Sequence, residues 1–162
     1  TLQLIHSGHS RILYLYTSVS YSGVNKMEGY KAALKENRIP VEHSMIHQCS
    51  KSFENSRDLL LSLKEEGLKF DAVLASDDSL AVGAVKYAHT AGISMPEELS
   101  IIGYNNSLLA RCTDPEITSI DSKVEALCTT TVNTLMGVFS GANVPNRTTI
   151  ASALIKRKTT NF

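Results

Sequence analysis

The stretch FDAVLASDDSLAVGAVKYAHTAGISMPEELSIIGYNN, residues 70–106, decides the fold of this 162-residue chain. Its apolar runs at residues 72–75 and 99–102 are short and bounded by polar or turn residues, a pattern typical of strands buried on both faces of a parallel sheet. Between them, residues 79–91 have the length of a helix that Asp78 caps and a following glycine ends. The stretch therefore predicts a strand, a helix and a second strand.

Polar side chains follow both of these strands. In an open α/β sheet the carboxyl ends of the strands meet at one edge, and ligands bind in the crevice beyond that edge. We therefore expect one edge to carry Ser76, Asp77, Asp78, Asn105 and Asn106. We assign Asp78 to capping the helix and Asp77 to contacting a ligand beside Asn105. Because paired carboxylates also occur in catalytic and metal sites, an enzyme is a further hypothesis.

The rest of the chain continues the alternation of strands and helices. Further strands are expected at residues 11–16, 42–48, 117–120 and 149–156, and helices at residues 26–36, 53–66 and 123–139. The strand at residues 42–48 alternates polar and apolar side chains, which is typical of a sheet edge. A loop at residues 17–25 carries hydroxyls, those of Ser20 and Tyr21 among them, that suit a polyhydroxylated ligand. This order predicts an α/β fold with a doubly wound parallel sheet.

Composition narrows the classes of function. The 16 basic residues balance the 16 acidic ones, so the chain lacks the positive charge expected of a nucleic-acid-binding surface. The three cysteines are widely spaced, which argues against a disulfide framework or zinc site and favours a reducing cytoplasm. No apolar run is long enough to span a membrane. Neither a dinucleotide fingerprint, a P-loop nor a GxSxG elbow is present, so we expect no cofactor, no metal and no hydrolase triad.

Six segments resemble the effector-binding core of the LacI/GalR family of bacterial transcription regulators. They occur in family order along nearly the whole chain: GHSRI (8–12), KMEGYKAAL (26–34), FDAVLASDDSLAVGAV (70–85), AGISMPEELSIIGYNN (91–106), DPEITSI (114–120) and LIKRKTT (154–160). The resemblance implies a periplasmic-binding-protein-like fold of type I, in which two α/β subdomains enclose a small effector.

The resemblance also implies a division of the chain. Residues 1–114 correspond to the C-terminal effector-binding subdomain, residues 115–152 to an excursion into the N-terminal subdomain, and residues 153–162 to a return strand. Because the chain begins at Thr1, we expect a piece of a longer protein whose helix-turn-helix module lies elsewhere.

Carried over position by position, the resemblance assigns effector contacts. The family's arginine corresponds to Lys26, its asparagine after the third strand to Asp77, and its aspartate after the fourth strand to Asn105; Ser122 and Val124 match positions that close over the effector. A lysine cannot make the bidentate fork of an arginine, and exchanging Asp for Asn adds a donor. The effector is therefore expected to differ from a common hexose or pentose.

The same resemblance places a dimer surface at Leu80, Val82, Leu108 and Leu109. We hypothesise a non-enzymatic effector-binding and dimerisation domain of a cytoplasmic transcriptional regulator that senses a small, sugar-like ligand. Its partners would be the effector, a second copy and operator DNA contacted through the absent module, and no membrane. The alternative is a periplasmic sugar-binding protein of a transport system, which shares the fold.

Overall fold

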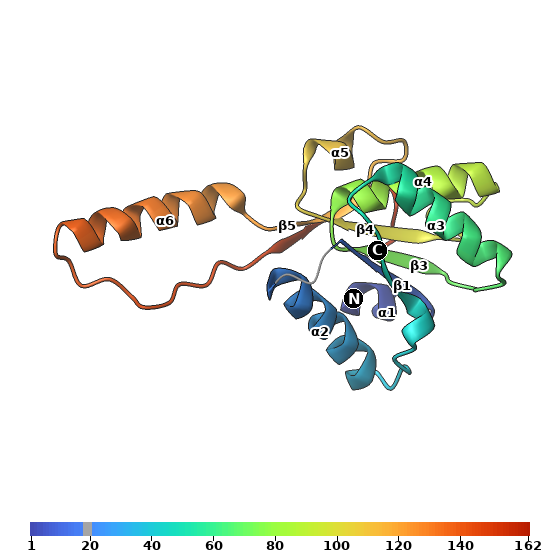
Figure 1. Ribbon diagram of the computed structural model, residues 1–162, viewed down its shortest axis with the longest axis horizontal. Helices are drawn as coiled ribbons and strands as arrows, with labels where there is room; N and C mark the ends of the chain where they lie inside the picture. Colours follow the sequence, from blue (N-terminus) through green and yellow to red (C-terminus); the bar gives the residue numbers. More distant parts are fainter. Residues whose placement is uncertain (18–20) are drawn as a thin grey trace.

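A computed structural model describes residues 1–17 and 21–162 (Figure 1). Its helices are α1 (Leu2–His6), α2 (Tyr21–Glu36), α3 (Phe53–Glu65), α4 (Asp78–Ala91), α5 (Leu108–Arg111) and α6 (Val124–Phe139), with a 3-10 turn η1 at His43–Met45. Its strands are β1 (Ile12–Tyr16), β2 (Ile46–Gln48), β3 (Ala72–Ala75), β4 (Ser100–Tyr104), β5 (Thr118–Asp121) and β6 (Ala153–Ile155).

These strands form one sheet in the order β2-β1-β3-β4-β5-β6. The first five are parallel, and β6 pairs antiparallel with β5. The strand order reverses direction at β1, whose neighbours are β2 and β3. This is the doubly wound arrangement that the sequence predicts, with β2 at the edge as expected. β6 is antiparallel because α6 does not pack over the sheet, so the chain returns directly beside β5.

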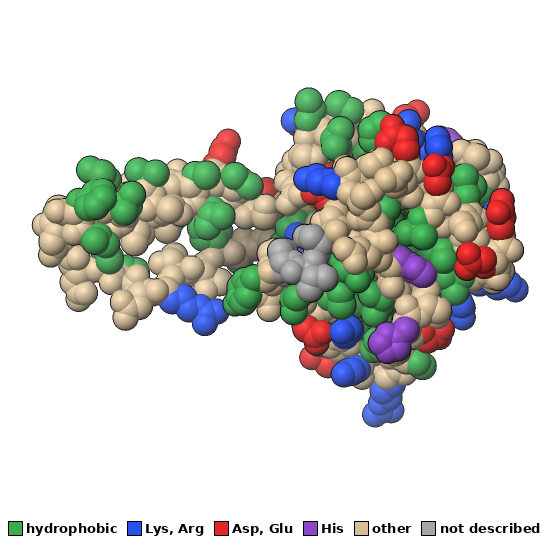
Figure 2. All heavy atoms as spheres, in the orientation of Figure 1, with side chains coloured by type: hydrophobic (Ala, Val, Ile, Leu, Met, Phe, Trp, Pro, Cys, Tyr) green, Lys and Arg blue, Asp and Glu red, His purple; other side chains and the backbone are tan. Residues whose placement is uncertain are grey.

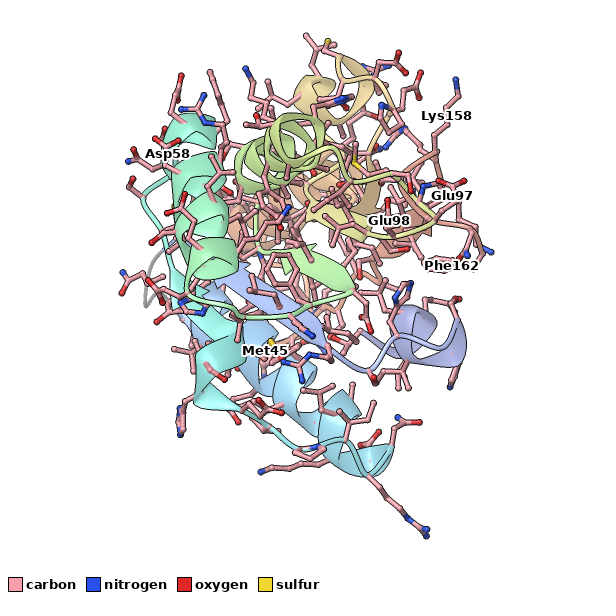
Figure 3. The ribbon with its side chains drawn as sticks, turned by 90° about the vertical axis from the view of Figure 1, so that its right-hand side faces the viewer. Met45, Asp58, Glu97, Glu98, Lys158 and Phe162 are labelled. Atoms are coloured by element: carbon pink, nitrogen blue, oxygen red, sulfur yellow. The ribbon has the colours of Figure 1, made fainter. Side chains whose placement is uncertain are left out.

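Both faces of the sheet are covered, and alternate residues of each strand face opposite helices. In β1, Leu13 and Leu15 pack with α3 and α4, whereas Ile12 and Tyr14 pack with α1 and α2. A side view shows α3 along one face, with Asp58 on its outer surface, and α2 beyond the other (Figure 3). The apolar runs of the sequence are continuous because both faces of the strands are buried.

Most predicted boundaries hold, and several differ. Ser52 caps α3 through its side chain, which accepts from the Asn55 amide, and Gly92 ends α4 in the left-handed conformation. α2 begins at Tyr21 rather than at residue 26, so part of the predicted hydroxyl loop is helical. The predicted strands at residues 42–48 and 149–156 are each reduced to three residues.

Helix α6 and the segment that returns from it form an arm that projects from the body of the molecule (Figure 1). No residue of α6 is buried. Its exposed apolar side chains form the α6 apolar surface, which consists of Val124, Leu127, Val132, Leu135, Met136, Val138 and Phe139. Figure 2 shows hydrophobic side chains gathered along this arm. The arm therefore presents apolar surface that none of the described residues buries.

The predicted dimer surface divides into two parts. Leu80 is 0% exposed and Val82 is 8% exposed, and both belong to the core between α3, α4 and the sheet. Their assignment to an interface is therefore wrong, because α4 is covered by α3 and packs these side chains inward. Leu108 and Leu109 are 66% and 43% exposed on α5. Their role at an interface stays a prediction.

Candidate functional site

The candidate site lies at the carboxyl edge of the sheet, beside the point where the strand order reverses. Ser76 and Asp77 follow β3, Asn105 follows β4, and Lys51 lies between β2 and α3. In doubly wound sheets the crevice at this reversal is where ligands bind. β1 also ends at this edge, and the predicted contact Ser20 lies outside the described residues. The chain topology thus collects polar groups from several segments at one place.

Asp77 has two functions at this edge. Its Oδ1 accepts hydrogen bonds from the backbone amide of Ser79 at 2.9 Å and from the Ser79 hydroxyl at 2.7 Å, which caps the first turn of α4. Its Oδ2 accepts from Asn105 Nδ2 at 3.0 Å and lies 2.9 Å from Lys51 Nζ. Asp77 and Asn105 therefore meet as predicted, but the assignment of Asp78 as the cap is wrong. Asp78 is the first residue of α4 and points into the protein.

The environment of Asp77 favours its ionised form. Burial by itself would raise the pKa of this carboxyl group, but the hydrogen bonds from Ser79 and the contact with Lys51 together hold the pKa below its ordinary value of 3.8. Asp77 is thus a charged acceptor at neutral pH.

Lys26 extends from α2 toward the same edge. Its Nζ donates to the carbonyl of Ser76 at 3.1 Å and lies 3.5 Å from the centroid of the Tyr104 ring, a cation–π distance. Burial lowers the pKa of Lys26 below its ordinary value of 10.5; Asp77 opposes this shift and Lys51 adds to it. Lys26 is therefore a partly desolvated cation that faces a carbonyl and an aromatic ring.

Asn105 and Val124 line one hollow of about 420 Å³ together with Asn106 and the start of α6. Asn105 is exposed at the end of β4, and its backbone is left-handed, with φ 104°. Ser122 is half-buried, and no contact joins it to this hollow in the described part of the chain. Tyr21 is exposed at the first position of α2. The structure thus brings Lys26, Asp77, Asn105 and Val124 to one edge.

Two members of the edge were not predicted. Lys51 pairs with Asp77, and Tyr104 lies under Lys26. Both carried a signal in the sequence, because Lys51 follows a strand and Tyr104 ends one. The signal was weak because a predicted strand that ends at residue 48 does not specify which later residue turns back to the edge.

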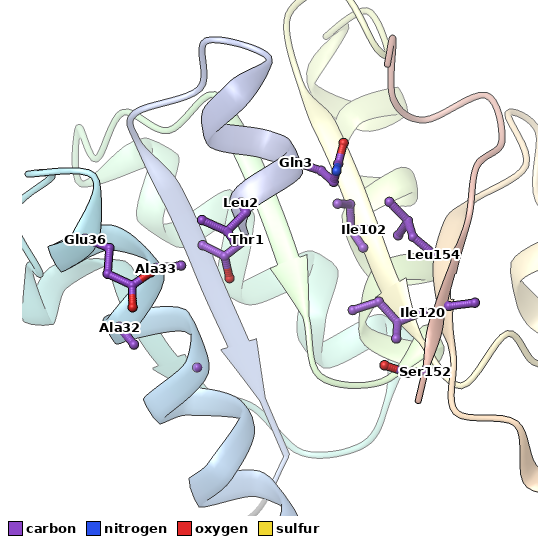
Figure 4. Close-up of a pocket in the computed structure, with 12 residues that line it drawn as sticks. Thr1, Leu2, Gln3, Ala32, Ala33, Glu36, Ile102, Ile120, Ser152 and Leu154 are labelled. Atoms are coloured by element: carbon purple, nitrogen blue, oxygen red, sulfur yellow. The ribbon is translucent and has the colours of Figure 1, made fainter. Parts of the chain in front are cut away.

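A second hollow is a groove of about 660 Å³ on the α2 face of the sheet (Figure 4). Its walls come from α1 and α2 on one side and from Ile102, Ile120 and Leu154 on the other. None of the predicted effector residues lines it. The charged and amide groups Lys26, Asp77 and Asn105 lie at the polar edge and not in this groove.

Within the described ranges, no group of three or more histidine, cysteine or acidic side chains is arranged to hold a metal ion. A search of the same residues finds no helix with the length and apolar character needed to cross a membrane. The three cysteines are free.

Comparisons with known proteins agree with this geometry. Residues 1–160 match the family model described as "Periplasmic binding protein-like domain". An HTH-type transcriptional regulator from Lachnoclostridium phytofermentans is 50% identical over 160 residues, which is 99% of this chain and 48% of that protein. The chain thus spans about half the length of the curated relatives it matches.

Solved structures agree as well. A sugar-binding transcriptional regulator of the LacI family from Escherichia coli, complexed with phosphate, has a TM-score of 0.90 and 29% identity, over 98% of this chain and 57% of that one. The dimeric Lac repressor with an 11-residue C-terminal deletion has a TM-score of 0.90 and 25% identity, over 98% of this chain and 58% of that one.

Fold and edge together define a periplasmic-binding-protein-like, effector-binding class of domain. Within that class, the chain belongs to the LacI/GalR family of transcriptional regulators. The relatives therefore favour a regulator over the transport protein considered as the alternative.

Proposed function

We propose that this chain is the effector-binding core of a cytoplasmic, non-enzymatic regulator that senses a small polar ligand, a sugar or sugar derivative. The observation that carries the proposal is the convergence of Lys26, Asp77 and Asn105 at the reversal of strand order. The ligand would shift the population of two conformations of the complete protein and so change its affinity for operator DNA.

The chemistry of the edge suits hydroxyl groups. Asp77 accepts, Lys26 donates, and the Asn105 amide does both, whereas a sugar hydroxyl both donates and accepts. The contacts of Asp77 with Lys51 and Asn105 are between side chains near solvent, so a ligand can replace them without exposing buried backbone. The sugar-binding relative in complex with phosphate supports the same ligand class.

We further propose the division of the chain that the family resemblance implies, with residues 115–152 belonging to a second subdomain. The projecting arm and its α6 apolar surface support this division for the part of the segment that follows β5, because such a surface requires a partner. Strand β5 itself pairs with β4 in the sheet and lies with the body. Operator DNA would be bound by a helix-turn-helix module outside this sequence. The exposed Leu108 and Leu109, and the dimeric Lac repressor among the similar structures, support a homodimer.

The test is isothermal titration calorimetry on the full-length protein with D-glucose, D-galactose, cellobiose, adenosine and glucose 6-phosphate. Lys26→Ala, Asp77→Ala and Asn105→Ala are each expected to weaken the affinity for any bound ligand roughly 10-fold or more, because each removes a hydrogen bond to or from a polar group. Lys31→Ala is the matched control, since Lys31 lies on α2 but pairs with Glu28.

If the three edge variants leave every observed affinity unchanged, the assignment of the site is wrong. Operator binding is measured in parallel by fluorescence anisotropy, with and without each ligand. A ligand that binds at the edge without changing operator affinity contradicts the regulatory part of the proposal.

A further inference from the structure

Asp78 is a buried carboxylate directly behind the candidate site. It is 1% exposed, although its neighbour Asp77 faces the edge. Asp78 Oδ2 accepts from the Ser107 amide at 2.7 Å and from the Ser107 hydroxyl at 2.8 Å, and Oδ1 accepts from the Ser119 hydroxyl at 2.6 Å. A single side chain at the start of α4 thus holds the segment after β4 and strand β5.

The segment that Asp78 holds is the turn that carries Asn105. Asn105 and Asn106 have φ angles of 104° and 50°, a left-handed region that residues other than glycine adopt only when the surroundings hold them. The Asn106 amide donates to Ser119 Oγ at 3.0 Å, and Arg157 Nη2 donates to Asn106 Oδ1 at 2.5 Å. Through Ser119 on one side and Ser107 on the other, the Asp78 carboxylate flanks both left-handed residues.

Space for this carboxylate depends on Gly103 in β4. A Cβ added at Gly103 would meet Asp78 Oδ1 at a distance that real structures do not show. The glycine therefore lets the carboxylate pass close to β4 and reach Ser119. An aspartate that only faced solvent at the start of a helix would not need the space left by Gly103. Nor would it need three hydrogen-bond donors from the protein.

We propose that Asp78 is the positioning residue of the candidate effector site. It holds the Asn105–Asn106 turn in the left-handed conformation in which Asn105 Nδ2 reaches Asp77 Oδ2. The effect of Asp78 on ligand affinity rests on the proposed function. Its effect on the conformation of the Asn105–Asn106 turn does not.

The same carboxylate joins the site to α5. Ser107 is the residue that precedes α5, whose Leu108 and Leu109 are exposed. One carboxylate thus accepts hydrogen bonds from both the amide and the hydroxyl of the residue at the start of α5.

The first test is amide hydrogen exchange on the full-length protein. Asp78→Ala is expected to speed exchange of both the Asn106 and Ser107 amides about 10-fold or more, because both lose direct or indirect support. Ser119→Ala removes only the branch to Asn106, so only that amide is expected to exchange faster. Ser56→Ala is the control, since this buried serine donates to the Leu80 carbonyl of α4, away from the edge.

The amides of Leu13 and Val73 report whether the core remains folded in each variant. If Asp78→Ala does not fold, Ser119→Ala decides the question alone. Exchange at Asn106 within 2-fold of wild type in a folded Ser119→Ala variant, or equal acceleration by Ser56→Ala, overturns the proposal.

The second test repeats the calorimetry with the five ligands named above. Both variants are expected to weaken binding of any ligand that wild type binds by about 10-fold, and Ser56→Ala is expected to leave it unchanged. If amide exchange becomes faster while ligand affinity stays unchanged, the turn does not position Asn105 for the ligand. This result would overturn the role of Asp78 in ligand binding. If wild type binds no ligand, the proposed function fails while the exchange result still decides the role of Asp78.

Discussion

At the scale of single residues, the candidate site depends on how charges are partnered at a half-buried edge. Asp77 is both the cap of α4 and the acceptor for Lys51 and Asn105, so a ligand that displaces Lys51 leaves the cap intact. Lys26 is held by a carbonyl and a ring and not by a carboxylate. The titration of these two groups therefore reports on the site before any ligand is known.

Replacing Lys51 with Met is expected to raise the pKa of Asp77, because the opposite charge that stabilises the carboxylate is lost. The folded pKa of Asp77 is below the ordinary value of 3.8. The stabilisation that its ionised form contributes is therefore complete above pH 3.8 and is lost as the pH falls through the folded pKa. In Lys51→Met this loss is expected to be smaller. Carbon-13 NMR of the Asp77 carboxyl measures the pKa directly, with Lys31→Met as control; an unchanged pKa contradicts the ion pair.

Lys26 predicts a rise of stability with pH as well, but at alkaline pH and because burial, rather than an ion pair, lowers its pKa. Its folded pKa lies below 10.5, so in the window between the two values the unfolded chain binds more protons and stability rises with pH. Lys26→Met lacks this titration. We measure the free energy of unfolding of wild type and of Lys26→Met in urea between pH 8 and 10. The value for wild type is expected to rise with pH relative to that of Lys26→Met. A difference that is constant over this range would argue that Lys26 is not desolvated.

At the scale of elements, α3 and α4 pack tightly against each other at Gly83. A Cβ at Gly83 in α4 would collide with the backbone carbonyl of Phe53 and the side chain of Ser56. Neither neighbour is the free end of a flexible side chain. Gly83 is thus required by the distance between two helices and not by its own backbone conformation.

Gly83→Ala is expected to destabilise the protein by about 1–3 kcal/mol, because the helices must move apart. Gly29→Ala is the matched control: Gly29 is exposed in α2 with no atom within 4 Å of an added Cβ, so this change is expected to stabilise by about 0.5–1 kcal/mol. Thermal unfolding followed by circular dichroism measures both. Equal effects of the two substitutions would contradict the assigned packing.

At the scale of the whole molecule, the compact body and the projecting arm differ in how their apolar side chains are used. The body buries its apolar residues on both faces of the sheet. The arm exposes the α6 apolar surface over the length of a helix (Figure 2). Exposed apolar surface of this kind promotes association when its natural partner is absent.

Leu135→Glu is therefore expected to weaken concentration-dependent self-association of this chain by about 10-fold, because a charge must be desolvated in any apolar contact. The melting temperature is expected to stay the same, since no residue of α6 is buried. Asn133→Glu adds the same charge to α6 at a position outside the apolar surface and serves as control. Sedimentation velocity at several concentrations measures association; equal behaviour of both variants would exclude this surface as its cause.

The sequence by itself determined the order of strands and helices, the doubly wound sheet and the edge at which polar groups collect. These features follow from local patterns: apolar runs of strand length, the Ser52 cap, and Gly92 at the end of α4. The family resemblance placed Lys26, Asp77 and Asn105 at that edge, where the structure also has them.

Only the tertiary structure decided which carboxylate faces the edge, which cation pairs with it and which leucines are buried. Asp78 turns inward because its partners Ser107 and Ser119 arrive from 29 and 41 residues further along the chain. Leu80 is buried because α3 covers it, although its spacing on α4 alone is equally compatible with an interface. Side-chain direction at the end of a strand depends on distant neighbours, and a local pattern contains no information about them.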